Sequence, residues 1–181
     1  MKKRSSCDDS IPPAPEHAGG PIMLACSTFR RSEHAARVAL EKATECGEIV
    51  LVNVVDVNVR RYLIGSDIGL YPDLGKRAEE ELLEVHARQG RVAMNAIAER
   101  AKAKGLRATV HVRTGRFALV CLEIIKEVKP SLVVTTRSRR PAWLRKLFGS
   151  PVDYLMAHAS CPVIIAESRK IASAGRDDDE A

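Results

Sequence analysis

The sequence predicts an α/β protein in which a five-stranded parallel sheet lies between two layers of helices, an open α/β/α sandwich. Two observations carry this prediction. Short apolar runs alternate with stretches of helical periodicity in the order β-α-β-α-β-α-β-α-β, which implies parallel strands joined by right-handed crossovers. The apolar runs are continuous in Val, Ile and Leu without polar alternation, as expected for strands that are buried on both faces.

The first strand, helix and second strand have clear boundaries. The first strand is the apolar run Pro21–Cys26. Ser32 is suited to cap a helix that runs from Glu33 to about Glu45, since a serine hydroxyl accepts a hydrogen bond from a free amide of the first turn. The buried stripe of this helix comprises Ala36, Leu40 and Ala43. Gly47 ends the helix, and Ile49–Val55 is the clearest strand in the chain.

A long helix is predicted after a connection rich in glycine and proline. It spans Lys76–Lys104, and Gly105 closes it. Its inner stripe comprises Leu82, His86, Gly90, Ala93, Ile97 and Ala101. We expect His86 to be a core histidine with a backbone partner rather than a ligand for a metal.

The second half of the sequence supplies three further strands and two further helices. The strands are Thr109–Arg113, Leu132–Thr136 and Pro162–Ala166. One helix, Phe117–Val128, ends before Pro130. The other begins after Ser150, where a capping serine is followed by Pro151 at the first helical position and Asp153 at the third.

The predicted elements form one folded domain, Pro21–Glu167, between two tails. Met1–Gly20 mixes charged residues, Pro, Ser and Gly without periodicity, and we expect it to be a flexible leader. Ser168–Ala181 ends in four acidic residues and is expected to be a solvated, flexible tail.

Composition limits the location of the protein and its chemistry. The five cysteines include no Cys-x-x-Cys pair, and this indicates a reducing, cytoplasmic environment. The apolar runs are shorter than a membrane span, and the first residues do not resemble a secretion signal. Histidines and cysteines lack the spacing of a metal site, and no motif of a catalytic nucleophile or a phosphate-binding loop is present. We therefore expect neither a metal nor enzymatic activity.

The most basic segment of the chain is Arg137–Lys146, in which five of ten residues are basic and none is acidic. It connects the fourth strand to the next helix, and in parallel α/β sheets such loops bind ligands. The segment could be a solvated surface, or an anion patch for a small phosphate-bearing ligand or an acidic protein. Nucleic acid is a less favoured partner, because Trp143 is the only aromatic residue within this segment that could stack on bases.

Several short segments together resemble the universal stress protein family. They are Ser32-Glu33-His34, Thr114-Gly115, Gly149-Ser150 and the closing phrase His158–Ile165. The resemblance covers Pro21–Glu167 and implies a Rossmann-like, adenine nucleotide alpha hydrolase-like fold. It also implies a cytoplasmic stress-response protein that forms a homodimer through its last strand, here Val163, Ile164 and Ile165. Some members of this family bind ATP and others do not.

The ATP-binding members carry an aspartate after the first strand and a signature of three glycines that ends in serine or threonine. In this sequence the aspartate position is Ser27, and the first two glycine positions are Thr136 and Arg139. Only Gly149-Ser150 matches. A β-carbon at either glycine position restricts the close approach of the backbone to phosphate.

These departures predict a non-enzymatic regulatory protein that does not bind ATP in the family's standard manner and needs no cofactor. The alternative is a protein that binds ATP, AMP or a cyclic nucleotide through arginines in place of glycines, with slow ATPase activity. The candidate anion-binding residues are Ser27, Gly115, Thr136, Arg137, Arg139, Arg140, Gly149 and Ser150.

Overall fold

The computed structural model describes residues 19–28, 30–56, 72–137 and 150–166; for residues 72–79 it describes the backbone alone. Most of the predicted leader, the acidic tail, and Arg139, Arg140 and Gly149 of the candidate site lie outside the described residues. So does Trp143.

The described residues form a parallel sheet of five strands, which confirms the predicted fold class. The strands are β1 (Ile22–Ser27), β2 (Glu48–Asp56), β3 (Arg107–Gly115), β4 (Leu132–Thr135) and β5 (Val163–Ile165). Their order across the sheet is β3-β2-β1-β4-β5, and every neighbouring pair is parallel. The chain therefore builds outward from β1 to one edge and then reverses, so that β1 and β4 flank the switch point of the topology.

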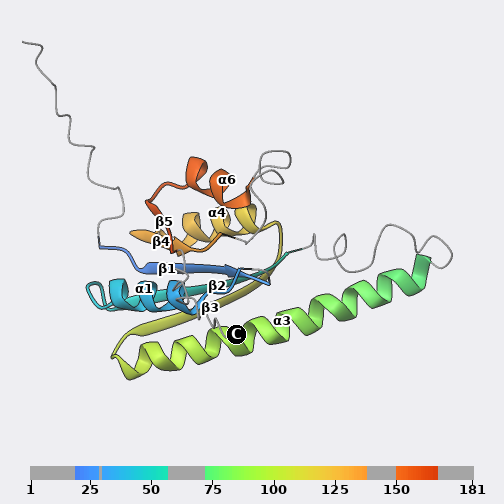
Figure 1. Cartoon of the computed structure of the whole chain (residues 1–181), viewed down its shortest axis with the longest axis horizontal. Helices are drawn as coiled ribbons and strands as arrows, with labels where there is room; N and C mark the ends of the chain where they lie inside the picture. Colours follow the sequence, from blue (N-terminus) through green and yellow to red (C-terminus); the bar gives the residue numbers. More distant parts are fainter. Residues whose placement is uncertain (1–18, 29, 57–71, 138–149, 167–181) are drawn as a thin grey trace, which may run out of the picture.

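Helices cover both faces of this sheet, as Figure 1 shows. One layer comprises α1 (Glu33–Ala43) and α3 (Pro72–Ala103), and the other comprises α4 (Phe117–Val128) and α6 (Pro151–His158). Successive side chains of a strand point to opposite faces. In β1, Leu24 accordingly packs in the core beneath α1 and α3, while Met23 packs in the core beneath α4.

The helix starts follow the predicted capping chemistry. The Ser32 hydroxyl accepts a hydrogen bond from the Ala35 amide (3.3 Å), and the Ser150 hydroxyl accepts one from the Asp153 amide (3.4 Å). Most boundaries lie within one or two residues of the predicted ones, and two elements show the clearest differences. The long helix begins at Pro72 rather than Lys76, since proline is well suited to the first turn. Strand β3 extends beyond Thr109–Arg113 at both ends, because those residues also pair with β2.

The buried face of α3 also differs from the predicted stripe. Among the residues of this helix whose side chains are described, the buried ones are Gly90, Met94, Ala98 and Ala101. Gly90 and Ala101 were predicted, whereas the predicted Ala93 and Ile97 are only half-buried. The helix is therefore rotated relative to the predicted stripe, and Met94 points into the core.

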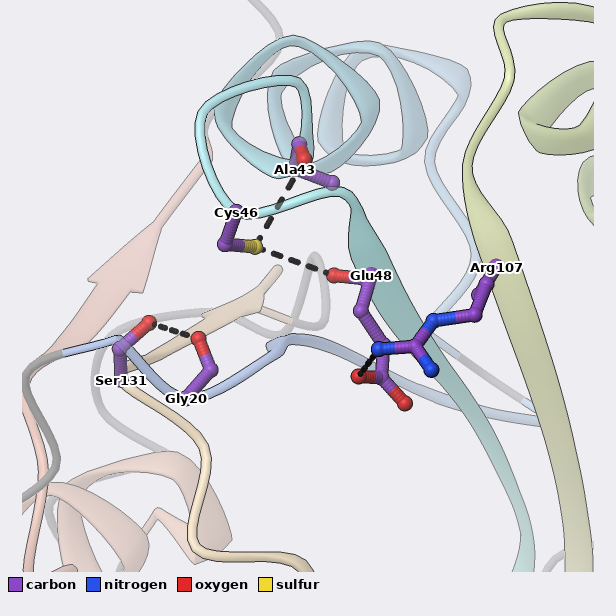
Figure 2. Close-up of polar contacts among 6 residues, drawn as sticks. All are labelled: Gly20, Ala43, Cys46, Glu48, Arg107 and Ser131. Carbon is purple, nitrogen blue, oxygen red and sulfur yellow. Dashed lines mark hydrogen bonds and ion pairs between the residues drawn. The ribbon is translucent and has the colours of Figure 1, made fainter.

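Polar contacts connect residues at the amino-terminal ends of the strands, at the opposite end of the strands from the switch point (Figure 2). Arg107 of β3 pairs with the Glu48 carboxylate of β2 at 3.1 Å. The Ser131 hydroxyl donates to the Gly20 carbonyl at 2.7 Å and ties the entry of β4 to that of β1. The Cys46 thiol lies 3.3 Å from the Glu48 carbonyl oxygen and 3.6 Å from that of Ala43. These contacts hold the amino-terminal ends of neighbouring strands together, so their role is structural.

In the described part of the chain, no helix has the length and apolar character needed to cross a membrane.

Candidate functional site

The candidate site lies at the carboxyl ends of β1 and β4. Ser27 ends β1, Thr136 and Arg137 directly follow β4, and Ser150 begins α6. Helix amino termini and strand ends converge at this kind of edge, and their free amides favour anions. The topology thus brings four of the sequence-predicted residues to one region. Gly115 ends β3, which β2 separates from β1.

Ser27 is buried and held by a tight turn. Its amide donates to the Arg30 carbonyl (3.2 Å), and the Arg30 amide donates to the Ser27 carbonyl (3.0 Å). The Arg30 side chain folds back over this turn, and its Nη1 donates to the Ser27 hydroxyl at 3.4 Å. The hydroxyl that sequence reasoning assigned to a ligand therefore accepts a hydrogen bond from the protein itself.

Arg30 is the main feature of this site that sequence reasoning missed. Its side chain is buried, with only 4% of the residue exposed, and its guanidinium carbon lies 4.8 Å from the centre of the Phe117 ring. A guanidinium over an aromatic face is attracted by the electrons of the ring, more so when water is excluded. Arg30 thus joins the end of β1 to the start of α4. The only sequence signal is the pair Arg30-Arg31, which follows a buried strand after two intervening residues.

Arg137 is also bound to a partner. Its Nη2 lies 2.7 Å from Oδ1 of Asp153, in the first turn of α6. The Asp153 amide in turn donates to the Ser150 hydroxyl. A carboxylate in the first turn stabilises a helix through the helix dipole. The predicted anion-binding arginine and serine therefore both support the start of α6 in this structure.

The remaining described residues of the predicted site are structural or peripheral. The Thr135 hydroxyl donates to the Ala25 carbonyl (2.9 Å) and holds β4 against β1, while its neighbour Thr136 is half-buried. Gly115 has a steric role. A β-carbon at this position would lie 2.7 Å from Cγ2 of Val120, so the turn between β3 and α4 requires a residue without one.

Burial keeps three thiols of the described part of the chain protonated at neutral pH. Burial raises the pKa of the Cys26 thiol to about 12 and that of the Cys161 thiol to about 11, and it also raises the pKa of Cys121. A protonated thiol is neither a good nucleophile nor a metal ligand. Among the described residues, no group of three His, Cys, Asp or Glu side chains could hold a metal ion.

Comparisons with known proteins agree with this architecture. A family model described as the universal stress protein family matches residues 20–167. The universal stress protein UspA from Lactobacillus plantarum is 19% identical over 81% of this chain and 97% of its own, with a TM-score of 0.57. A protein of the universal stress protein family from Burkholderia pseudomallei is 20% identical over 83% of this chain and 98% of its own, with a TM-score of 0.52.

A third similar structure is that of a universal stress protein in complex with cAMP, 15% identical over 82% of this chain and 98% of its own, with a TM-score of 0.55. At these identities the structures share the fold. A comparison with curated protein sequences finds no match.

Proposed function

Since the chain belongs to the universal stress protein family, we propose that it is a non-enzymatic stress-response regulator that does not bind ATP in the family's standard manner. One observation carries the proposal: the buried Arg30 guanidinium lies beside Ser27 and over Phe117. By the resemblance in sequence, Ser27 stands at the position where ATP-binding members have an aspartate. Here the position carries a neutral hydroxyl that already accepts a hydrogen bond.

The physical argument concerns displacement. A nucleotide that used the end of β1 would have to move the Arg30 side chain away from the Phe117 ring or bind elsewhere. Moving it would break the contact with the ring and the hydrogen bond to Ser27. The free-energy cost is high, because the buried guanidinium would lose the contacts that compensate for its removal from water. The pair of Arg137 with Asp153 acts in the same direction, because a carboxylate at the start of α6 repels phosphate.

A second candidate function is the binding of a compact phosphate-bearing ligand, such as AMP or a cyclic nucleotide. The same buried guanidinium favours it, because Arg30 places a positive charge at the switch point, where α/β sheets bind ligands. One structure of similar fold is a complex with cAMP. A small phosphate ligand or an acidic partner protein would also suit the basic segment Arg137–Lys146.

Nucleotide binding is testable by thermal unfolding and calorimetry. We expect ATP with Mg²⁺ to leave the midpoint of unfolding of the unmodified protein unchanged, whereas a ligand present at about 100 times its Kd adds roughly 2.7 kcal/mol of stability. The variant Ser27→Asp, Thr136→Gly, Arg139→Gly restores the family's residues. We expect it to bind ATP only when Arg30→Ala is added, because the guanidinium otherwise occupies the region beside residue 27.

The matched control is Arg31→Ala. Arg31 is exposed, and its substitution removes the same charge from the position next to Arg30. It should not enable ATP binding in the triple variant. Stoichiometric ATP binding by the unmodified protein would contradict the proposal. Binding of AMP or cAMP without ATP would instead favour the second function.

We further propose that the protein forms a homodimer through β5. This strand lies at the edge of the sheet, and Ile164 on it is 40% exposed. An apolar edge strand favours pairing with another chain, and a second copy of this strand offers a matching edge. The family resemblance also implies a dimer through the last strand and a cytoplasmic location.

Substituting Ile164→Lys should convert the dimer to a monomer at micromolar concentration, because a lysine at the interface would have to lose its hydration. Sedimentation velocity measures the change. Val92→Lys is the matched control, because Val92 is 70% exposed on α3, away from β5, and should leave the dimer intact. A monomeric unmodified protein, or an Ile164→Lys variant that remains a dimer, would contradict the proposed interface.

A further inference from the structure

A second group of polar side chains lies on the opposite face of the sheet, beneath α3. Asn53 is in β2, where its neighbours at alternate positions, Ile49 and Leu51, belong to the core beneath α1 and α3. The residue is 0% exposed. Neither the oxygen nor the nitrogen of its side-chain amide has a hydrogen-bond partner among the residues that the structure describes.

The Asn53 amide points at Gly90 of α3. A β-carbon on Gly90 would lie 2.9 Å from Cγ of Asn53 and closer still to Nδ2. His86 lies one turn earlier on the same side of this helix, since residues four apart are neighbours on a helix surface. Both nitrogens of its imidazole are buried, and within the described part of the chain neither has a partner. The backbone partner expected for His86 is therefore not found there.

Thr28 extends this group toward β1. Its amide donates to the Val54 carbonyl at 3.2 Å, which places Thr28 beside the end of β2. Its hydroxyl is buried and, like the other two side chains, unpaired within the described ranges. Cys26, which lies opposite Asn53 in the register of β1 and β2, contributes a thiol that stays protonated because burial raises its pKa to about 12.

Three neighbouring side chains whose polar atoms are buried and lack a partner among the described residues are unusual, because proteins pair nearly all such groups. Leucine has almost the shape of asparagine, and at position 53 it would fill the same space without the cost of an unpaired amide. Amide, imidazole and hydroxyl groups can each donate and accept a hydrogen bond. Such a set suits a neutral molecule that carries both donors and acceptors.

We propose that Asn53, His86 and Thr28 form a second binding site, on the α3 face, for a neutral molecule with hydrogen-bond donors and acceptors. Water is the smallest molecule of this chemistry, and a small amide or alcohol is a larger one. Asn53 and the Arg30 side chain lie on opposite faces of the sheet, because Asn53 faces α3 whereas Arg30 packs on Phe117 of α4.

A high-resolution crystal structure of the full-length protein, purified without added ligand, tests the occupant. We expect density within hydrogen-bond distance of the Asn53 amide. Isolated peaks identify water, and connected density identifies a larger molecule; either result supports the site. A direct hydrogen bond between Asn53 and His86, or a side chain from residues 57–71 in the same place, overturns the proposal.

A substitution at position 53 gives an independent test, through the direction in which it shifts the midpoint of thermal unfolding. Asn53→Leu keeps the shape of the side chain and removes the amide. If the amide binds an occupant, this variant should unfold several degrees below the unmodified protein. Where the occupant is water, nuclear Overhauser spectra of the unmodified protein should show contacts between water and the Asn53 side-chain amide protons. A midpoint that is unchanged or raised by the substitution overturns the proposal, because the amide then gains no stability from a bound occupant. Asn95→Leu, at an exposed position of α3, is the matched control and should raise the midpoint slightly or leave it unchanged, because leucine is the better helix former.

Discussion

Replacing Phe117 by alanine should lower the free energy of unfolding by about 3–5 kcal/mol, as measured by urea denaturation. The residue is only 1% exposed and has the largest of the fully buried side chains among the residues that the structure describes. It packs at the start of α4 in the core that this helix shares with the sheet. Its removal would leave a cavity and would also remove the aromatic face beneath Arg30. Domains are stable by about 5–15 kcal/mol, so the variant should be close to unfolding at moderate temperature.

A milder pair of substitutions separates packing from the contact with Arg30. Phe117→Leu keeps an apolar side chain, and Arg30→Met keeps an unbranched stem without the charge. If the guanidinium is attracted to the ring, the two changes should be coupled by about 0.5–2 kcal/mol in a double-mutant cycle. Additive effects would show that Arg30 only fills space beside Ser27, and would weaken the argument that it excludes a nucleotide.

The reason why Arg30 was not predicted is physical. A basic residue in the loop that follows a strand is usually exposed, and nothing local in the sequence indicates that Arg30 is buried. Arg30 is buried because Phe117, which is far away in the sequence, lies above the same end of β1. Ser27 could be predicted, since it follows an apolar strand and matches a position in a family motif. The pairing of Arg137 with Asp153 depends on how α6 meets β4, and the sequence alone does not determine this geometry.

The fold itself could be predicted more fully than the site. Strands buried on both faces are continuous apolar runs, and caps such as Ser32 and Ser150 mark helix starts through local chemistry. The sequence predicts a start of α3 at Lys76, because Pro72 and Gly75 are residue types typical of a connection, whereas the helix begins at Pro72. The rotation of α3 was also missed. Met94 rather than Ala93 points into the core, and this depends on how closely Gly90 approaches β2.

The close approach of Gly90 to β2 predicts the second large effect on stability. Gly90→Ala should destabilise the protein by about 1–3 kcal/mol, the usual cost of adding a methyl group to a filled core. In an exposed helix the same change would stabilise by roughly 1 kcal/mol, because alanine is the better helix former. Here steric conflict should win. The new carbon would lie 2.9 Å from Cγ of Asn53, and Asn53 is fully buried, so its side chain cannot turn away into solvent.

Two comparisons make the steric explanation specific, and both use urea denaturation. Gln89→Ala, at the exposed neighbouring position, should change the free energy of unfolding little. In an Asn53→Ala background the obstacle is gone, so Gly90→Ala should become neutral or stabilising. This reversal of sign would locate the conflict between residues 53 and 90. If Gly90→Ala instead destabilises equally in both backgrounds, the backbone of α3 rather than Asn53 requires the glycine, and the close packing of α3 on β2 has another cause.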